Sequence, residues 1–440
     1  MQNLSTHYSA HIEELQSRTE HALLKSDSAD FIVIHAGMPN MVFLDDYPYP
    51  FKVNPHFKAW LPILESPNCW LIVNGVDKPK LFYFQPIDFW HKVIPLDEHY
   101  WNEYFSIDVV NTKSELNRML KPYLSNSICI TEHVEFAAEI GFTKVNESST
   151  IDYFHYHRAY KTDYEFECLR RSNAIAVKGH NAAKKAFYDG QSEYDIYMAY
   201  LSASQQTESE TPYGSIVALN ENAAILHYTH FERSAPNKVR SFLIDAGATF
   251  HGYASDITRT YSFEKNRFSE LIDQMHLLMK ESVKGLKVGQ SYVELHAAAY
   301  RNISEVLKNF DILKVSAEEA CEKKIVTSFF PHGLGHHLGM QTHDVAGFMQ
   351  DENGTHLDTP KKFSTLRVSR KIEARQVFTI EPGVYFIDSL LKDLENSESK
   401  NKVNWDVINE LKPFGGIRIE DDIIVHSDGN ENMTRNLGLN

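Results

Sequence analysis

Cysteine is scarce in this sequence. Its 440 residues include four cysteines, and no two of them are spaced as a Cys-x-x-Cys pair. Such pairs are typical of disulfide frameworks and thiolate metal sites. The sequence therefore argues against both and predicts buried structural thiols at the four positions, which are Cys69, Cys129, Cys168 and Cys321.

Long hydrophobic runs are missing as well. No segment approaches the roughly 18 apolar residues that a membrane-spanning helix needs. The N-terminal segment MQNLSTHYSAHIEELQSRTEHALLK carries charges throughout, in place of the apolar core of a signal peptide. We therefore expect a soluble, cytoplasmic protein with no membrane partner.

Charge of one sign never forms a long block. The formal net charge of −15 is spread along the chain, and an acidic surface argues against binding to a phosphate backbone. We therefore expect no nucleic-acid partner. Histidine, in contrast, is common, with 22 residues, so the question is whether these side chains cluster.

The first part of the chain alternates short apolar runs with helix-like segments, beginning with a helical pattern over residues 8–25. That alternation predicts an α/β domain. The apolar runs expected to be strands are Phe31–His35, Trp70–Val73, Leu81–Phe84, Ile107–Val110 and Ile128–Ile130.

A proline-rich stretch interrupts this pattern. Asp45–Phe57, DDYPYPFKVNPHF, contains three prolines and four aromatic rings, so we expect neither a helix nor a central strand there. Two interpretations stay open: a rigid surface loop, or a loop that covers a pocket in a neighbouring subunit.

A domain boundary is predicted near residue 160. Thr162 and Glu165 have the spacing of a capping box, and a long helix is expected to follow as far as Tyr188, closed by Gly190. We therefore expect domains at residues 1–160 and 161–440.

The second domain carries a weak internal repeat. Gly-Gln-Ser precedes an expected helix at residues 190–192 and again at 289–291. Downstream, FTIEPG at residues 378–383 has the form of FLIDAG at residues 242–247, an apolar strand that ends in an acid, a small residue and glycine. The repeat predicts two halves that face each other across a cleft.

The FLIDAG strand is expected to form a hairpin with the segment after it. Folding the strands Ser241–Thr249 and Tyr253–Ser262 about Phe250 and His251 places Asp245 opposite Asp256. Two carboxylates on directly opposed residues of neighbouring strands must share a proton or a cation. The alternative is that this face, which continues through Thr258 and Thr260, is solvated.

Three further segments add acids and imidazoles. Phe329–Phe348, rich in glycine, is expected to be extended and to present His332 and His336. FTIEPG supplies Glu381. Phe414–Val425 supplies Glu420, with Arg418 on the same side of the strand. For any one of these acids alone, an ordinary ion pair or a solvated carboxylate is the better interpretation.

Taken together, four carboxylates and an imidazole are a ligand set for two divalent cations. Hard oxygen donors with one nitrogen suit Mn²⁺ first, with Co²⁺ or Zn²⁺ as alternatives. Two ions about 3.5 to 4 Å apart would activate a shared water and polarise a carbonyl. The pattern predicts metal-assisted hydrolysis.

Five segments in a fixed order resemble the pita-bread metallopeptidases: LIDAG, DITRT, HGLGHHLG with His343-Asp344 after it, TIEPG and GGIRIEDD. The first domain resembles that of prolidases and aminopeptidases P. Within the family the chain is most similar to bacterial Xaa-Pro dipeptidases, whose relatives include organophosphorus acid anhydrolases, and Phe43–Pro62 resembles a loop of that subgroup. The resemblance implies an α/β N-terminal domain and an α+β catalytic domain with pseudo-twofold symmetry.

The resemblance also implies residue roles. Asp256 and Glu420 are expected to bridge two metal ions, and His337, beside the ligand His336, is expected to be structural. The Asp45 loop is expected to come from the partner subunit of a homodimer. The implied metal ligands are Asp245, Asp256, His336, Glu381 and Glu420; the implied catalytic histidines are His227 (in the strand ILHYTH), His332 and His343; and the implied substrate-binding residues are Arg418, Arg367, Arg370, Tyr213 and Asp45.

The implied activity is hydrolysis of dipeptides that end in proline, with organophosphorus ester or fluoride hydrolysis as a side activity. Two alternatives stay open: an aminopeptidase P that acts on longer peptides, and a non-catalytic protein that binds peptide or protein partners. The complete ligand set argues against the metal-free creatinases, and the N-terminal domain argues against methionine aminopeptidases.

Overall fold

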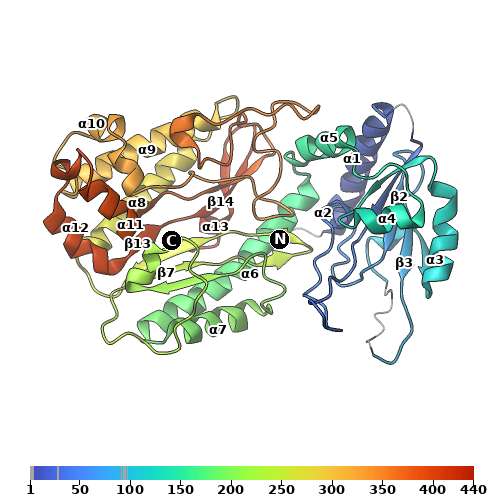
Figure 1. Cartoon of the computed structure of the whole chain (residues 1–440), viewed down its shortest axis with the longest axis horizontal. Coiled ribbons are helices and arrows are strands. Elements are labelled where there is room, and N and C mark those ends of the chain that lie inside the picture. Colours follow the sequence, from blue (N-terminus) through green and yellow to red (C-terminus); the bar gives the residue numbers. More distant parts are fainter. Residues whose placement is uncertain (1–3, 27–28, 91, 93–95, 97) are drawn as a thin grey trace. The chain divides into compact units, whose positions relative to one another are not determined.

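The computed structural model describes residues 4–26, 29–90, 92, 96 and 98–440. The chain divides into two compact units, Met1–Cys168 with Gln350–His356, and Leu169–Met349 with Leu357–Asn440 (Figure 1). We predicted the boundary at residues 160 and 161; the units divide inside a helix that begins at Asp163. The short segment 350–356 groups with the first unit although it lies far along the chain.

The first unit is an α/β fold built on a five-stranded sheet in the order β4-β3-β2-β1-β5. Strand β2 runs antiparallel to both neighbours, whereas β1 pairs with β5 and β3 with β4 in parallel. Helices lie on either side of the sheet (Figure 1). The elements are α1 (Ser5–Leu24), β1 (Phe31–His35), α2 (Pro55–Lys58), β2 (Trp70–Val73), β3 (Lys80–Phe84), β4 (Ser106–Val110), α3 (Lys113–Leu120), β5 (Ser127–Ile130), α4 (Val134–Ile140) and α5 (Ser148–Arg158).

All five predicted strands are confirmed. Strands β2 and β5 are buried at every residue, as continuous apolar runs with neighbours on both faces of a sheet should be. The thiols of Cys69, Cys129 and Cys168 are buried, that of Cys321 is partly exposed, and none of the four forms a disulfide. The prediction of buried thiols is therefore wrong for Cys321 alone.

The proline-rich stretch is a surface loop over most of its length. Met41 bridges Pro48, and Val42 N–H donates to the carbonyl of Tyr47 at 2.9 Å, which closes a small turn. Its end differs from the prediction, because residues 55–57 begin helix α2. Pro55 occupies the first helical turn, where a missing N–H costs nothing, and the side chain of Asn54 caps the helix.

The second unit contains two three-stranded antiparallel sheets, β10-β7-β6 and β11-β14-β15, and two short strand pairs, β12-β13 and β8-β9. Its helices are α6 (Asp163–Tyr188), α7 (Glu193–Ser204), α8 (Arg267–Gly285), α9 (Tyr292–Asn309), α10 (Ala317–Glu322), α11 (Asp388–Glu395), α12 (Trp405–Leu411) and α13 (Met433–Asn436). Its strands are β6 (Ile216–Leu219), β7 (Ser241–Asp245), β8 (Thr249–Phe250), β9 (Tyr253–Ala254), β10 (Thr258–Ser262), β11 (Val377–Ile380), β12 (Gly383–Tyr385), β13 (Gly416–Arg418), β14 (Asp421–Val425) and β15 (Asn430–Asn432).

The predicted helix starts are confirmed. Thr162 and Glu165 form the reciprocal capping box before α6. Ser192 and Ser291 cap α7 and α9 through their hydroxyls, each after a glycine with a positive φ. The repeated Gly-Gln-Ser is thus the same capped entry into a helix, used twice.

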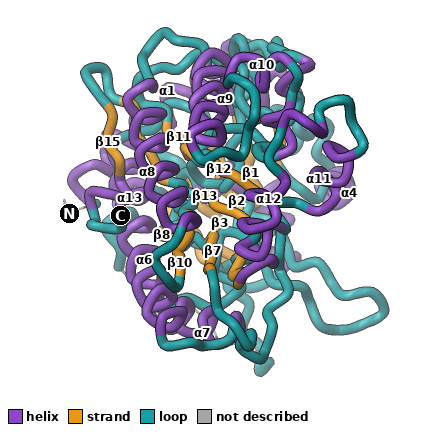
Figure 2. Tube along the Cα trace, turned by 90° about the vertical axis from the view of Figure 1, so that its left-hand side faces the viewer, coloured by secondary structure: helices purple, strands orange, loops and turns teal. Residues whose placement is uncertain are grey.

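Helices α8 and α9 pack on each other and enclose one side of the main apolar core of the second unit, together with strands β11 and β14. In the view of Figure 2 they pass in front of the strands. The core fixes the strands whose ends carry the acidic residues. No helix among the described residues is both long and apolar enough to cross a membrane.

Candidate metal centre

The hairpin around His251 differs in register from the prediction. Phe250 pairs with Tyr253, so the turn consists of His251 and Gly252, both with positive φ. Asp245 therefore pairs with Thr258, and the predicted pairing with Asp256 is wrong by two residues. A slip of two residues keeps a side chain on the same face, so Asp256 stays diagonal to Asp245.

The predicted continuous strands are also wrong at residues 246–248 and 255–257, which belong to no strand. The ladder is interrupted between β7 and β8 and between β9 and β10. Gly247 lies there against the opposite backbone: a Cβ on it would stand 1.9 Å from the carbonyl oxygen of Ser255. Asp256 therefore lies outside the regular ladder, between β9 and β10.

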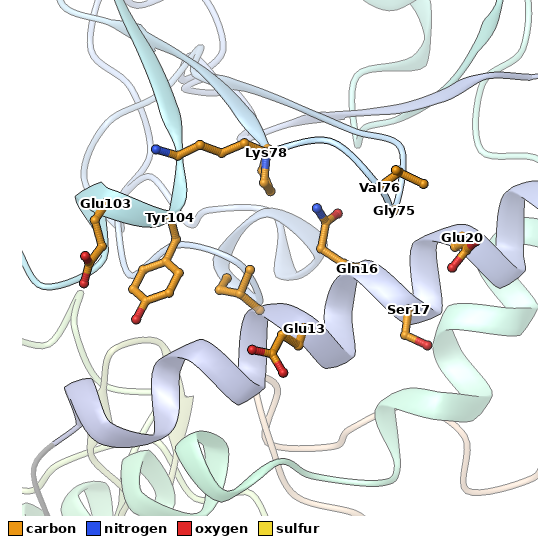
Figure 3. A pocket seen from close by; sticks show the side chains of 11 residues that line it. Glu13, Gln16, Ser17, Glu20, Gly75, Val76, Lys78, Glu103 and Tyr104 are labelled. Carbon is orange, nitrogen blue, oxygen red and sulfur yellow. The ribbon is translucent and has the colours of Figure 1, made fainter.

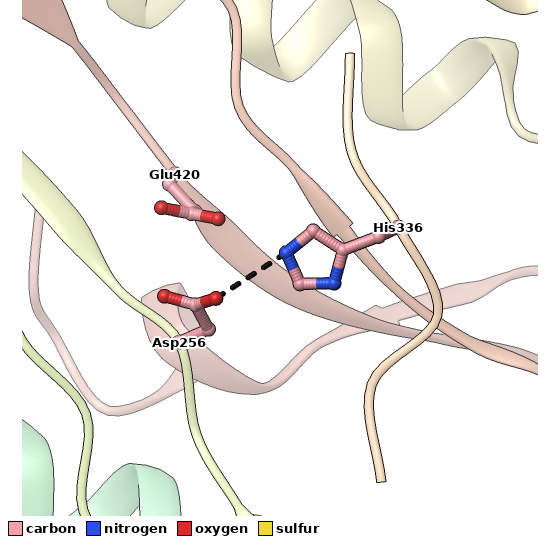
Figure 4. A group of neighbouring side chains, drawn as sticks. All are labelled: Asp256, His336 and Glu420. Carbon is pink, nitrogen blue, oxygen red and sulfur yellow. Dashed lines mark ion pairs between the residues drawn. The ribbon is translucent and has the colours of Figure 1, made fainter. Parts of the chain in front are cut away.

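Three predicted ligands converge. Asp256, His336 and Glu420 are buried, and ligand atoms from all three lie within 4.8 Å of one another (Figure 4). His336 Nε2 lies 3.3 Å from Asp256 Oδ2 and 3.9 Å from Glu381 Oε1. The side chains come from the segment before β10, from the glycine-rich segment, from the turn after β11 and from between β13 and β14.

Asp245 is connected to this group by two side chains. Tyr213 Oη lies 2.8 Å from Asp245 Oδ1 and 2.5 Å from Asp256 Oδ1, so its single hydroxyl links the two carboxylates. Arg418 Nη2 lies 2.6 Å from Asp245 Oδ2. All five predicted metal ligands are thus brought together, although they are spread over 176 positions of the sequence, from Asp245 to Glu420.

The glycine-rich segment contains no α-helix, as predicted, and bridges β11 at His337. Residues 339–343 are bends and 345–348 form a turn, so the prediction of extended chain is wrong for its second half. Gly335 packs against the backbone of β11, where a Cβ would lie 2.0 Å from the carbonyl oxygen of Thr379. His336 N–H donates to Thr379 Oγ1, and its Nδ1 lies 2.9 Å from the carbonyl oxygen of His337. Because a carbonyl only accepts, Nδ1 carries a proton, and Nε2 is the ring atom that faces the carboxylates and would bind a metal ion.

The group brings several acidic side chains together in a buried site. Burial, reinforced by Asp256 and the other acids, raises the pKa of Glu420 well above its usual range, and burial raises the pKa of Glu381 to about 7. Burial alone would lower the pKa of His336, but the carboxylates outweigh it and raise the pKa to about 8. Without a cation, protons must offset the mutual repulsion of these carboxylates.

This donor set fits divalent metal ions. Asp256 and Glu420 are 5% and 2% exposed, and buried carboxylates this close are stable only when paired or bound to metal. Imidazole presented through Nε2, with Nδ1 fixed by a backbone carbonyl, is the usual form of a histidine ligand. The neighbouring basic residues, Arg418 and His336, compensate only part of the negative charge of these carboxylates.

His332 stands beside the acids in a chain of hydrogen bonds. Its Nδ1 donates to the carbonyl of Gly333 at 2.7 Å, and its Nε2 accepts from Tyr385 Oη at 2.8 Å. Tyr385 in turn accepts from Arg418 Nη1 at 2.9 Å. Burial and the nearby Arg418 lower the pKa of His332 to about 3, so His332 is a neutral imidazole.

The other two predicted catalytic histidines are less enclosed. The ring of His343 packs edge-on against that of His336, with centroids 4.5 Å apart. Burial, His336 and Arg367 lower the pKa of His343 to about 4. His227 is exposed and lies in a turn, so the prediction that ILHYTH is a strand is wrong; residues 225–230 follow a 3-10 helix and pair with no strand.

The predicted substrate residues differ in surroundings. Arg367 is exposed, whereas Arg370 is 3% exposed and its guanidinium bonds to Glu373 at 3.0 Å. Arg418 is also buried, with its nitrogens directed at Asp245, Tyr385 and Thr258. Asp45 lies in the exposed loop of the first unit.

Two residues in contact with the site were not predicted to belong to it. Tyr385 bridges Arg418 and His332, and Thr258 donates to Glu420. The polar face through Thr258 was a sequence signal for the second. No comparable signal marks Tyr385, since an aromatic residue in a strand is ordinarily a core residue.

A separate hollow of about 570 Å³ lies in the first unit between α1 and the turn that joins β2 to β3 (Figure 3). Gln16, Glu13 and Lys78 are among its lining residues, and none of the predicted site residues lines it. It is therefore distinct from the acidic group.

Comparison with known proteins identifies the family of this chain. The family model described as "Metallopeptidase family M24" matches residues 167–427. The chain belongs to metallopeptidase family M24. A second model, "Xaa-Pro dipeptidase, N-terminal domain", matches residues 6–156. The predicted enzyme class, a metallopeptidase, is confirmed.

Members of family M24 similar to this chain over its whole length include named dipeptidases. The Xaa-Pro dipeptidase of Colwellia psychrerythraea is 54% identical over 437 residues, which cover 99% of this chain and 98% of that protein. The Xaa-Pro dipeptidase of Pseudoalteromonas translucida is 53% identical over 440 residues, covering both chains completely.

Solved structures confirm the predicted fold, an α/β domain followed by an α+β catalytic domain of the pita-bread type. Escherichia coli aminopeptidase P with the inhibitor Pro-Leu superposes with a TM-score of 0.74 at 25% identity, covering 97% of this chain and 95% of that chain. A Zn-substituted form of the same enzyme in complex with product gives the same values.

Proposed function

We propose that this M24 metallopeptidase is an Xaa-Pro dipeptidase that uses two divalent metal ions. The observation that carries the proposal is the convergence of Asp256, His336 and Glu420 within 4.8 Å in a buried site. Glu381 and Asp245 would complete the ligand set, and Asp256 and Glu420 are the residues that would hold both ions. Identity above 50% to two named Xaa-Pro dipeptidases supports the substrate class.

Metal ions bound there would polarise the scissile carbonyl and activate a water molecule. We assign Mn²⁺ because four of the five donors are carboxylates. Protein residues supply proton acceptors and hydrogen-bond donors around this centre. His332 donates through Nδ1 to a carbonyl and accepts at Nε2 from Tyr385, so it enters the reaction as a neutral imidazole. His343 and His227 are the further proton carriers that we propose.

The carboxylate of the dipeptide needs a cationic partner that is not already engaged. Arg418 and Arg370 are buried and bonded to Asp245 and Glu373. Arg367 is exposed and lies close enough to His343 to lower its pKa. We therefore assign the substrate carboxylate to Arg367, and Arg418 becomes a positioning residue for Asp245 and Tyr385.

The test is metal-dependent cleavage of defined peptides. The protein is stripped with a chelator, reloaded with Mn²⁺ and assayed with Leu-Pro, Gly-Pro and an Xaa-Pro tripeptide. Restored cleavage of the dipeptides, with little turnover of the tripeptide, is the expected result. Tripeptide turnover without dipeptide turnover would instead identify an aminopeptidase P, the alternative favoured by the structural likeness to that enzyme. No bound metal and no cleavage would identify a binding protein.

Hydrolysis of organophosphorus esters or fluorides is the side activity that we propose for the same centre. A tetrahedral phosphoryl group has the shape of the species formed when an amide is attacked, so the same residues would stabilise both. Assays of a P–F and a P–O substrate with the Mn²⁺-loaded protein test this. Activity that persists in Asp256→Asn would refute the shared centre.

The protein is further proposed to work as a cytoplasmic homodimer. The turn of the Asp45 loop exposes an apolar group, with Phe43 86% and Leu44 91% exposed and Met41, Tyr47 and Tyr49 more than half exposed. Exposed apolar groups of this kind mark interfaces. The partner surface that we propose for them is a second copy of the chain, with Asp45 contributed to its pocket.

A further inference from the structure

Thr258 occupies the junction between the two acidic strands. It is fully buried, pairs with Asp245 across the β7–β10 ladder and forms an isolated bridge with Glu420 on its other side. Its backbone carbonyl accepts from Glu420 N–H at 3.0 Å. Thr258 thus pairs with one proposed metal ligand on each side, Asp245 and Glu420.

The hydroxyl of Thr258 has a fixed direction. It lies 2.6 Å from Glu420 Oε2 and 3.2 Å from Arg418 Nε. A guanidinium only donates, so the oxygen accepts from Arg418 and its single hydrogen goes to the carboxylate. The hydroxyl therefore links Arg418 to Glu420 by two hydrogen bonds. Arg418 Nη2 also forms an ion pair with Asp245.

We infer that Thr258 is a positioning residue that sets the orientation of the Glu420 carboxylate for metal binding and couples it to the Arg418–Asp245 pair. The inference rests on the proposed dimetal function and deepens it. Glu420 lies after β13 and before β14, so its backbone is held by Thr258 and its carboxylate plane is held by the Thr258 hydroxyl. Removing the hydroxyl leaves the backbone bridge intact and frees the carboxylate to rotate.

Thr260 is the matched control. It lies two residues on in the same strand and is also buried. Its hydroxyl accepts from Arg418 N–H at 3.1 Å and donates to the Arg418 carbonyl at 3.0 Å, and so contacts backbone alone. Thr260→Val deletes an equally buried hydroxyl without touching a carboxylate.

The experiment compares the parent chain with Thr258→Val, Thr258→Ser and Thr260→Val. Mn²⁺ binding to the metal-free proteins is measured by calorimetric titration, and thermal melts report folding. Thr258→Val is expected to weaken the binding of at least one ion by roughly 10- to 100-fold, as loss of an outer-shell partner typically does. Thr258→Ser is expected to restore the affinity to within a few fold, because serine keeps the hydroxyl. Thr260→Val is expected to lower the melting temperature with the affinity unchanged.

Two outcomes would overturn the inference: Thr258→Val binds Mn²⁺ as the parent does, or Thr260→Val loses affinity equally. Should Thr258→Val fail to fold, Thr258→Ser decides, since a full loss of affinity in a folded serine variant contradicts the hydroxyl's role. A parent chain that binds two ions but cleaves no Xaa-Pro dipeptide refutes the proposed function and leaves the positioning role standing. A parent with normal cleavage and an unaffected Thr258→Val refutes only the positioning role.

Discussion

Asp256 uses both carboxylate oxygens within the site. One accepts from Tyr213, and the other faces His336 Nε2 at 3.3 Å. Hydrogen bonds from His336 and Tyr213 outweigh burial and keep the pKa of Asp256 below its usual value. The residue is therefore a carboxylate at neutral pH, whereas burial raises the pKa of its neighbour Glu420.

We predict that Asp256→Asn abolishes binding at both metal positions. An amide lacks the second anionic oxygen that a bridging ligand needs, so kcat/KM should fall about 10³-fold or more, since the centre supplies several kcal/mol. Elemental analysis after Mn²⁺ loading and dialysis measures the loss. Asp245→Asn is the comparison and should retain one ion per chain; two ions retained by Asp256→Asn would contradict the bridging role.

Arg367 carries the second residue-scale prediction. Arg367→Met should raise KM for Leu-Pro by roughly 10- to 100-fold, because a charge-assisted hydrogen bond contributes about 1.5 to 3 kcal/mol. The value of kcat should change little. The matched substrate is Leu-Pro amide, which lacks the carboxylate and should show the same KM with parent and variant. An equal increase for both substrates would assign Arg367 another role.

Buried neutral histidines should make the protein acid-sensitive. His35 stacks on Trp70 with ring centroids 4.2 Å apart, and burial with nearby His133 lowers its pKa to about 3. A histidine whose folded pKa lies below the unfolded value of about 6.5 stabilises the protein fully above pH 6.5, and this stability is lost as the pH falls toward 3.

We therefore predict that His35→Phe flattens the loss of stability below pH 6.5. Between pH 6.5 and 5 the parent should lose about 2 kcal/mol through His35 alone, and the phenylalanine keeps the stack while removing the titration. Denaturant melts at the two pH values measure the difference. His21→Phe, at an exposed site on α1, should retain the parent's pH dependence, and an unchanged slope in His35→Phe would sink the explanation.

At the scale of elements, the hairpin shows how far sequence reasoning reaches. Alternation correctly assigned Asp245 and Asp256 to one face, because a two-residue slip preserves the face. The register itself depended on which two residues form the turn. His251 adopts a positive φ of 50° beside Gly252, and the predicted fold about Phe250 and His251 placed the centre of the hairpin one residue too early.

Contacts between segments far apart in the sequence were the second feature that the sequence did not predict. Helix starts, strands and the lack of an α-helix in the histidine segment follow from local patterns and capping residues. The contacts of Arg418 with Tyr385 and of Thr258 with Glu420 join segments far apart in the sequence, and spacing does not encode them. The ligand set came from the family resemblance, which supplied the three-dimensional frame that local patterns lack.

The interrupted ladder leads to an element-scale prediction. Gly247→Ala places a Cβ where the Ser255 carbonyl stands, so the strands must separate beside Asp256. We expect Mn²⁺ affinity to fall by at least tenfold together with stability, by about 1 to 3 kcal/mol for overpacking. Titration calorimetry and melts test this. Gly429→Ala, where nothing lies within 4 Å and φ is not positive, should leave both unchanged; normal affinity in Gly247→Ala would show that the ladder does not position Asp256.

At the scale of the whole molecule, the exposed loop predicts assembly. Phe43→Ser combined with Leu44→Ser should convert a dimer to a monomer, because burial of two large side chains is lost at about 1.5 to 3 kcal/mol each per copy. Sedimentation velocity measures the change. Val76→Ser removes a 76% exposed apolar residue elsewhere in the first unit and should leave the dimer intact. A monomeric parent would end the proposal.

The distance in sequence between Thr258 and Glu420 has a consequence for biosynthesis. The two residues lie 162 positions apart, which takes roughly 8 to 30 s to translate. During that interval the emerging chain presents Asp245 and Asp256 without their partners from the second half. We expect the metal to be acquired only after the last strands have left the ribosome, so nascent chains halted before residue 420 should emerge metal-free, whatever the supply of Mn²⁺ in the cell.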